Sequence, residues 1–211
     1  MFVPSLYRET DKIETLSLIR KFPFATIITT DESGPYINHL PVLLDETGPE
    51  PRLIGHLSTA NPQLKHLEAG QEVTVVFNGP NAYISPSWYR GKEHVPTWNY
   101  AVVHVRGKSR VVSGERLREI LDRSVALFET TPGAYRFSEN PDLPASFQSE
   151  LMRAIAGFEI EMTHIDTKFK LGQNRNTEDY VGVIEGLGRC DNDMARGVRE
   201  LMIQRMETRS K

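Results

Sequence analysis

The sequence predicts an α+β fold built around an antiparallel β-barrel, and three observations support this prediction. Six segments rich in β-branched and aromatic residues are separated by short turn sequences, with one helical segment among them. Strand signals with this spacing are typical of an antiparallel barrel. Helical patterns dominate the second half of the chain, where apolar residues recur at intervals of three and four. We therefore expect a barrel with helices at its periphery and in the C-terminal region.

Composition is that of an ordinary globular protein. The chain has 211 residues, of which 39% are hydrophobic and 25% charged, enough for one large domain with a buried core. Its net charge of −3 argues against a broad basic surface for DNA. The single cysteine, Cys190, excludes an intramolecular disulfide and a cysteine-based metal site, and fits an intracellular setting. With no long apolar run, the sequence predicts a cytoplasmic protein without a membrane span.

The first part of the chain predicts one helix followed by three strands. The helix is expected over residues 10–21, where Asp11 can cap the first turn and Pro23 ends the pattern. Pro41 predicts an edge or a bulge in the second strand, because proline cannot donate to a ladder. The three strands, separated by turns rich in glycine and proline, are predicted over 24–30, 36–44 and 52–58.

The remaining elements follow from the same patterns. Asn61-Pro62 is typical of the start of a helical turn, which Gly70 ends. Ser113 can cap the first helix of the second half. The remaining strands are predicted over 72–77, 100–113 and 158–165, and the remaining helices over 115–129, 147–156, 177–187 and 192–207.

The segment 77–100 gathers both tryptophans of the chain, Trp88 and Trp98, and three of its seven tyrosines. Its three prolines interrupt strand pairing, so much of the segment is expected to be turn and loop. Large aromatic side chains beside hydroxyl and amide groups suit a flat ligand with a polar edge, and they also suit a subunit interface. Ordinary loop packing is the remaining explanation.

Short catalytic and metal-binding signatures are absent from the sequence. It contains no glycine-rich phosphate loop, no His-Glu-x-x-His pair, no Gly-x-Ser-x-Gly motif and no basic helix-turn-helix. The six histidines are too scattered to predict a metal site. Short motifs therefore leave the chemistry open.

Four longer phrases resemble the PaiB family of FMN-binding negative transcriptional regulators. The order and spacing of the phrases match the family, and the similarity runs from the N-terminal MFVPSLY to beyond residue 180. The phrases are GHLSTANPQ (55–63), FNGPNAYISPSWY (77–89), VPTWNYAVVHVRG (95–107) and KLGQNR (170–175). The chain departs from the family pattern at Thr59, Asn81 and Gly172, where the family tends to have a basic residue, a histidine and a serine.

The resemblance implies an antiparallel, Greek-key-like split β-barrel that binds FMN at the interface of a homodimer. Residues 1–211 then form a single domain, with a barrel core over about 22–113 plus the strand 158–165. Helical additions cover 115–156 and 177–207. The implied function is flavin-linked regulation of transcription, although the net charge gives no support for direct DNA binding. The fold is shared with redox enzymes, so the alternative is a small FMN-dependent oxidoreductase, or a flavin-free enzyme that uses the same pocket on a small-molecule metabolite.

FMN requires a cradle for its phosphate and faces for its ring. The segment from Ser58 to Asn61 ends a strand and opens a helical turn, where free N–H groups attract anions. Simple capping of the helix explains the same residues equally well. The candidate phosphate-binding residues are Ser58, Thr59, Asn61 and Lys65.

The resemblance places the isoalloxazine ring near the aromatic segment and the phrase 170–175. Trp88 and Trp98 can supply aromatic faces. Hydroxyl, amide and basic groups can bind the polar edge of the ring; the candidates are Ser87, Thr97, Asn99, Lys170, Gln173, Asn174 and Arg175. His56, which lies in the strand 52–58 beside the cradle, is the candidate for catalysis if the protein is an enzyme. Otherwise the cofactor would carry the chemistry.

Overall fold

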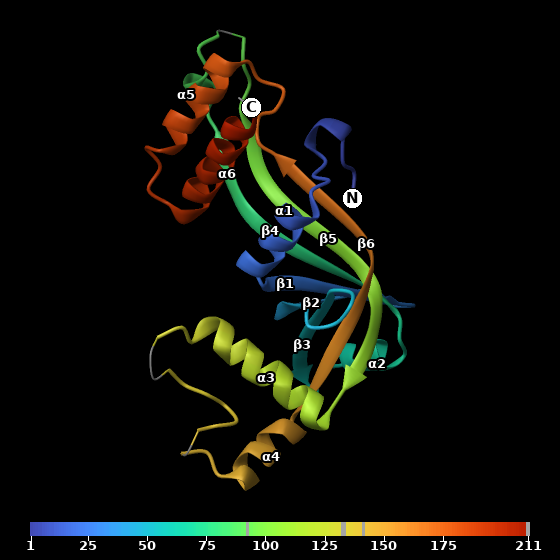
Figure 1. The fold of residues 1–211 in the computed structure, drawn as a ribbon. Helices are drawn as coiled ribbons and strands as arrows, with labels where there is room; N and C mark the ends of the chain where they lie inside the picture. The colour runs from blue at the N-terminus through green and yellow to red at the C-terminus, as the bar shows by residue number, and fades with distance from the viewer. Residues whose placement is uncertain (92, 132–133, 141, 210–211) are drawn as a thin grey trace. The chain divides into compact units, whose positions relative to one another are not determined.

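The computed structural model describes residues 1–91, 93–131, 134–140 and 142–209. Within them, six strands form a closed barrel in the order β1-β2-β3-β6-β5-β4, accompanied by six α-helices and two short 3-10 helices (Figure 1). The strands are β1 (Phe24–Asp31), β2 (Gly34–Asp45), β3 (Arg52–Ser58), β4 (Glu72–Ile84), β5 (Thr97–Val112) and β6 (Ile155–Lys170). The helices are η1 (Ser5–Tyr7), α1 (Lys12–Lys21), α2 (Gln63–Glu68), η2 (Pro86–Trp88), α3 (Gly114–Phe128), α4 (Ala145–Arg153), α5 (Thr177–Leu187) and α6 (Asp193–Arg209). The predicted antiparallel barrel with peripheral and C-terminal helices is confirmed.

The chain forms two compact units, and β4, β5 and β6 each contribute one part to both. We call residues 22–77 and 105–165 the barrel unit. Residues 1–21, 78–104 and 166–211 form the terminal unit. The expectation that residues 1–211 act as one domain stays a prediction. No helix among the described residues has both the length and the apolar character needed to cross a membrane.

Antiparallel ladders build the barrel unit. In β2, the residues up to Pro41 pair with β1, and pairing with β3 begins at Val42. Pro41 therefore lies where β2 passes from one neighbour to the other, which is where a missing N–H is tolerated. In the ladder between β3 and β6, Gly55 lies opposite Phe158. A Cβ atom at Gly55 would lie 2.6 Å from the Phe158 ring, so this position needs glycine.

Helix α3 packs on the barrel unit through an apolar stripe at helical spacing. Ile120 forms a buried cluster with Leu43 of β2 and Ile54 of β3. Leu117 and Leu121 form a second cluster with Phe137, and Met152 of α4 packs against it. The stripe predicted from the sequence thus attaches α3 to the sheet and brings α4 beside it.

The terminal unit joins the N-terminal helix to the two C-terminal helices. The Thr15 hydroxyl in α1 donates to Thr167 in β6 at 3.0 Å, with both groups buried. The Tyr180 hydroxyl in α5 donates to the Met202 carbonyl of α6 at 3.0 Å. Val198 and Met202 of α6 are fully buried, whereas Met194 at the start of the helix is 47% exposed.

Two local predictions were wrong, and a third holds only in part. The aromatic segment leaves the sheet between β4 and β5, but 77–84 continue β4 and 97–100 begin β5. Gly79 and Pro80 are both buried, which interrupts the alternation of buried and exposed residues along β4. The last strand was predicted to end at residue 165, whereas β6 continues to Lys170. The side chain of Ser113 makes no capping hydrogen bond to α3.

Candidate functional site

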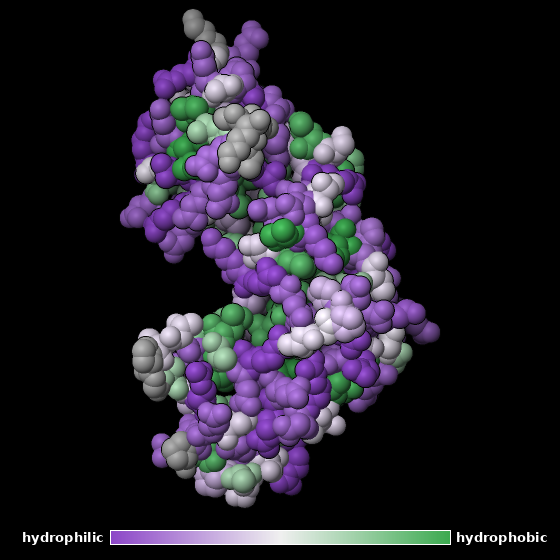
Figure 2. Space-filling model, in the orientation of Figure 1, coloured by the Kyte–Doolittle hydropathy of each residue, from purple (hydrophilic) through white to green (hydrophobic). Residues whose placement is uncertain are grey.

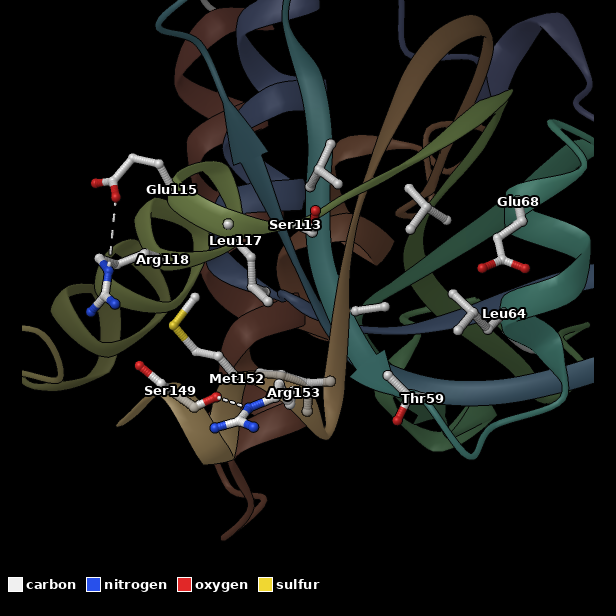
Figure 3. Close-up of a pocket in the computed structure, with 15 residues that line it drawn as sticks. Thr59, Leu64, Glu68, Ser113, Glu115, Leu117, Arg118, Ser149, Met152 and Arg153 are labelled. Carbon is white, nitrogen blue, oxygen red and sulfur yellow. Dashed lines mark hydrogen bonds and ion pairs between the residues drawn. The ribbon is translucent and has the colours of Figure 1, made fainter. Parts of the chain in front are cut away.

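A pocket of about 740 Å³ opens in the barrel unit beside α2, α4 and the N-terminus of α3 (Figure 3). Small-molecule sites have volumes of roughly 300–1,000 Å³, so this pocket can hold a cofactor. Figure 3 shows Thr59, Leu64 and Glu68 on one side, with the residues of α3 and α4 on the other. Most of the lining is apolar and consists of Leu64, Val111, Val112, Leu117, Met152, Ile155 and Ala156.

Thr59, Glu68 and Ser113 contribute polar groups to the pocket, and the other charged groups come from α3 and α4. Arg118 is engaged, because its Nη1 donates to Gln148 at 2.9 Å and its Nε lies 3.9 Å from Glu115. Arg153 uses only its Nε, which donates to the Ser149 carbonyl at 3.2 Å, and its guanidinium has no ion pair among the described residues. Arg153 is therefore the cation best able to bind an anionic group in this pocket.

The N-terminus of α3 also lines the pocket, through Ser113, Gly114 and Glu115. Gly114 has a φ of +59°, a conformation that favours glycine. Because no side chain caps the helix, its first N–H groups remain able to bind an anion.

The predicted phosphate cradle has the geometry of a closed turn. The Thr59 N–H and hydroxyl both donate to the Ala154 carbonyl, at 2.9 and 3.1 Å. The Asn61 N–H donates to the Ser58 carbonyl, and Asn61 Oδ1 accepts from the Gln63 N–H, each at 3.0 Å. These N–H groups already have protein acceptors, so the local geometry favours capping. Of the cradle residues, only Thr59 lines the pocket.

Lys65 in α2 is exposed, and its side chain has no hydrogen-bond or ion-pair partner among the described residues. It therefore keeps a free ammonium group. His56 lies opposite Gly157 in the ladder between β3 and β6, so both face the same side of the sheet. A Cβ atom at Gly157 would contact Val112 and Leu117, which line the pocket. Burial lowers the pKa of His56 and favours its neutral imidazole.

A buried ionic network holds α3 against the strands. Arg116 of α3 donates its Nε to Glu159 of β6 at 2.6 Å and its Nη2 to Asp45 of β2 at 2.5 Å. Arg110 also donates to Glu159, and Arg123 lies 2.6 Å from Asp45. Both carboxylates are 5% exposed. The network fixes the helix that forms one wall of the pocket.

The same contacts determine how the two carboxyl groups titrate. Burial opposes ionisation of Asp45, but hydrogen bonds from Arg123, Thr47 and Arg116 outweigh it and hold the Asp45 pKa far below its ordinary value. Burial likewise opposes ionisation of Glu159, and Arg110 and Arg116 outweigh it, so the Glu159 pKa is also lowered. Both groups are therefore ionised at neutral pH.

We expect acid to destabilise the chain through Asp45 and Glu159. Groups with a lowered pKa in the folded state stabilise it above their unfolded pKa of about 4, and this contribution is lost as the pH falls through the folded values. Urea unfolding should therefore show a decrease in stability below about pH 4. Asp45→Asn should have a shallower pH dependence than the wild type. An equal dependence in both would contradict the assignment.

In the terminal unit, three predicted flavin contacts lie together. Lys170 Nζ donates to the Thr97 hydroxyl at 2.5 Å and to the Trp98 carbonyl at 2.9 Å. Burial lowers the pKa of Lys170, Tyr100 opposes the change, and the positive charges of Lys168 and Arg175 add to it. Trp98 is 53% exposed and packs edge-to-face against Tyr83, with ring centroids 6.2 Å apart.

Other predicted ring contacts have partners inside the terminal unit. A Cβ atom at Gly186 would lie 2.2 Å from the Trp88 ring, so Trp88 packs directly on α5. Asn99 is 3% exposed and donates to the Met202 sulfur at 3.5 Å, and Gln173 hydrogen-bonds within its own turn, to Leu171 and Phe169. Ser87 lies 2.8 Å from the Ser85 hydroxyl, and Asn174 is exposed. Their role as flavin contacts stays a prediction.

Gly172, one of the departures from the family pattern, has a φ of +76°. Glycine is the residue that adopts this conformation most readily, which gives a local reason for its presence.

Sequence reasoning missed His94 and Asp179, which form a cluster with Arg175 in the terminal unit. His94 Nε2 lies 3.2 Å from Asp179 Oδ2, and Arg175 Nη1 lies 3.2 Å from His94 Nδ1. The local sequence signal was Asn176 followed three residues later by Asp179, a pattern typical of a helix start. Asn176 indeed caps α5, because its Oδ1 accepts from the Asp179 N–H at 2.8 Å. Nothing in the sequence connects this helix start with His94.

Comparisons with known proteins give a family model and two similar folds. Residues 1–164 match the model of a family described as "Putative FMN-binding domain". The chain is 35% identical over 212 residues to "Protease synthase and sporulation protein PAI 2" of Bacillus subtilis (strain 168), covering 98% of this chain and 99% of that protein.

Two solved structures resemble the chain at 16% identity and a TM-score of 0.63, which shows the fold alone. One is the FAD and heme binding protein from Mycobacterium smegmatis, with 83% of this chain and 78% of that chain covered. The other is the flavocytochrome Anf3 from Azotobacter vinelandii, with 83% and 75% covered.

Proposed function

The chain belongs to the family of FMN-binding domains that its residues 1–164 match, as its resemblance to the PaiB family predicted, and we propose that it binds FMN in the pocket beside α3. FMN is the cofactor that the family assignment gives. The single observation that carries the location is the combination of an apolar lining with a cation, Arg153, that has no ion pair within the described part of the chain.

The residues of the pocket fit the two ends of FMN. The aliphatic side chains of Leu117, Met152 and Ile155 provide an apolar surface for the isoalloxazine ring. Arg153 and the N–H groups at the start of α3 would hold the phosphate. Glu68 and Glu115 also line the pocket and oppose a phosphate, and Arg118, 3.9 Å from the Glu115 carboxylate, offsets the charge of Glu115. FMN, when bound, supplies electron and hydride transfer.

A visible absorption spectrum of the purified protein, followed by FMN titration, tests this proposal. Flavin that co-purifies, or that binds with micromolar affinity, supports it. If FMN neither co-purifies nor binds at micromolar concentration, the proposed flavin binding fails.

For biological role, we propose a flavin-linked regulator of transcription, as expected from the family resemblance. The net charge of −3 favours an indirect action over broad binding to DNA. A binding assay with labelled promoter DNA distinguishes the two. Salt-sensitive binding would support direct action, whereas no shift at low salt would favour indirect action.

An FMN-dependent oxidoreductase is the second candidate, and His56 is the observation that favours it. A half-buried, neutral imidazole on the side of the sheet that faces Val112 and Leu117 can accept a proton from a reduced or bound substrate. His56→Gln should then decrease turnover with a flavin-coupled substrate while leaving FMN affinity unchanged. Equal turnover in both proteins would remove His56 from the chemistry.

We also propose that the chain forms a homodimer through exposed apolar side chains. In the terminal unit, Phe2, Tyr83 and Trp98 are 83%, 48% and 53% exposed. In the barrel unit, Leu127 and Phe128 at the end of α3 are 43% and 58% exposed, and Figure 2 shows hydrophobic residues at the surface over this helix. Exposed aromatic side chains of this kind are favoured at interfaces.

Trp98→Ala is expected to weaken the dimer if Trp98 lies in its interface. Burying an aromatic side chain in an interface commonly contributes about 2 kcal/mol, or roughly a thirtyfold change in the dimer dissociation constant. Sedimentation velocity over a concentration series measures the constant, and Phe128→Ala tests the α3 surface in parallel. An unchanged dimer dissociation constant in the Trp98 variant would show that Trp98 does not contribute to the interface.

A further inference from the structure

In the terminal unit, the His94 side chain lies between the acidic residue Asp179 and the basic residue Arg175. Its side chain is 16% exposed, and that of Asp179 is 3% exposed. His94 Nε2 lies 3.2 Å from Asp179 Oδ2, and His94 Nδ1 lies 3.2 Å from Arg175 Nη1. The His94 ring also packs against the Tyr89 ring, with ring centroids 4.4 Å apart. The Arg175 guanidinium lies over the same Tyr89 ring, 4.5 Å from its centroid.

These contacts determine which nitrogen of His94 carries the proton. A guanidinium can only donate, so Nδ1 must accept from Arg175 and cannot carry a hydrogen. An ionised carboxylate can only accept, so Nε2 must donate to Asp179. Burial opposes ionisation of Asp179, but the N–H groups of Arg90 and Gly91 and the charges of His94 and Arg175 lower its pKa, which keeps it an acceptor.

We propose that His94 is a proton-operated latch, which holds Arg175 while the imidazole is neutral and releases it when the imidazole is protonated. A second proton on His94 must occupy Nδ1, where it faces the Arg175 N–H groups. The hydrogen bond is then replaced by contact between two donors of like charge. The contact with Asp179 survives, because Nε2 keeps its hydrogen. Only Arg175 is released.

The charged and titratable groups around His94 make this response specific to Arg175. Within the described residues, Asp179 from α5 is held by four donors, namely the Arg90 and Gly91 N–H groups, the Asn176 amide and His94. The Arg90 guanidinium is directed to Glu185, at 3.2 Å. Tyr89 presents its ring face to both cations. Among the described residues, His94 is the one titratable side chain to which Arg175 is hydrogen-bonded.

Release of Arg175 has a chemical consequence for the turn before α5. The guanidinium gains free N–H donors and becomes available to an anion, such as a phosphate or a carboxylate, at acidic pH.

Nitrogen-15 NMR of the full chain tests the latch without reference to flavin. At about pH 8 the His94 ring should show the Nε2–H tautomer, and at about pH 5.5 both nitrogens should be protonated. The Arg175 side-chain N–H signals, assigned with Arg175→Lys, should shift with the same midpoint as the His94 ring.

The matched variant is His94→Gln, whose amide can accept from Arg175 and donate to Asp179 but cannot titrate. Its Arg175 signals should be independent of pH, whereas the control His164→Gln should keep the wild-type response. The latch is overturned by an Nδ1–H tautomer at about pH 8. It is also overturned if the Arg175 N–H signals of the wild type do not shift with the same pH midpoint as the His94 ring. That outcome can be seen without any variant.

Discussion

Glu159→Ala is expected to destabilise the chain by about 3 kcal/mol, the lower end of the range for breaking a buried ion pair. Glu159 is 5% exposed and accepts from Arg110 and from Arg116 Nε, while Arg52 lies 3.4 Å away. Removing the carboxylate leaves three guanidinium groups without their common partner. Arg52 and Arg110 are 46% and 67% exposed and can turn to water, which keeps the loss near the lower end. Urea unfolding at neutral pH measures the change.

Glu161→Ala is the matched control for this experiment. Glu161 follows two residues later in β6, faces the same side of the strand and is exposed. Its removal should change the free energy of unfolding by less than about 0.5 kcal/mol. A similar loss in both variants would mean that net charge, and not the buried network, determines the stability.

Arg153→Glu is expected to raise the Kd for FMN between about tenfold and a hundredfold. A hydrogen bond to a charged group contributes roughly 1.5–3 kcal/mol, and about 1.4 kcal/mol corresponds to tenfold in affinity. Arg153 lines the pocket and has no carboxylate partner among the described residues, so reversing its charge leaves the phosphate facing an acid. Quenching of flavin fluorescence, or flavin absorbance after dialysis, gives the dissociation constants.

Two further variants locate the phosphate. Arg136→Glu makes the same charge change at an exposed residue of the barrel unit that does not line the pocket, and it should leave the Kd within about twofold. Lys65→Glu tests the cradle predicted from the sequence. If Lys65→Glu abolishes FMN retention while Arg153→Glu leaves it intact, the phosphate lies at the cradle and the proposed position in the pocket is wrong.

Much of the fold could be predicted because its signals are local. The strands 24–30 and 52–58 and the helix 177–187 were predicted to within a residue at each end, since β-branched runs, turn residues and helical spacing are properties of neighbouring residues. Family membership was predicted from whole phrases, which carry far more information than any short motif. The end of β4 was not predicted, because proline usually interrupts a strand, whereas Pro80 is buried within β4.

The candidate site was predicted less well, for a related reason. Ser58, Thr59 and Asn61 were placed correctly between a strand and a helical turn, but their N–H groups and side chains are used within the turn and by Ala154. That acceptor comes from the end of α4, far away in the sequence. Arg153 was not proposed at all, because an arginine near the end of an amphipathic helix looks like any other surface residue until the pocket is known.

The sequence by itself determined the fold class, the positions of most elements, the family and the cofactor, since each depends on patterns or phrases along the chain. The tertiary structure alone decided which charges are paired. Glu159 meets Arg116 across 43 residues, and His94 lies between Asp179 and Arg175, 85 and 81 residues further along the chain. Such partners are determined by strand order and helix packing, because a buried charge is stable only where the fold brings it to an opposite charge or a hydrogen-bond donor.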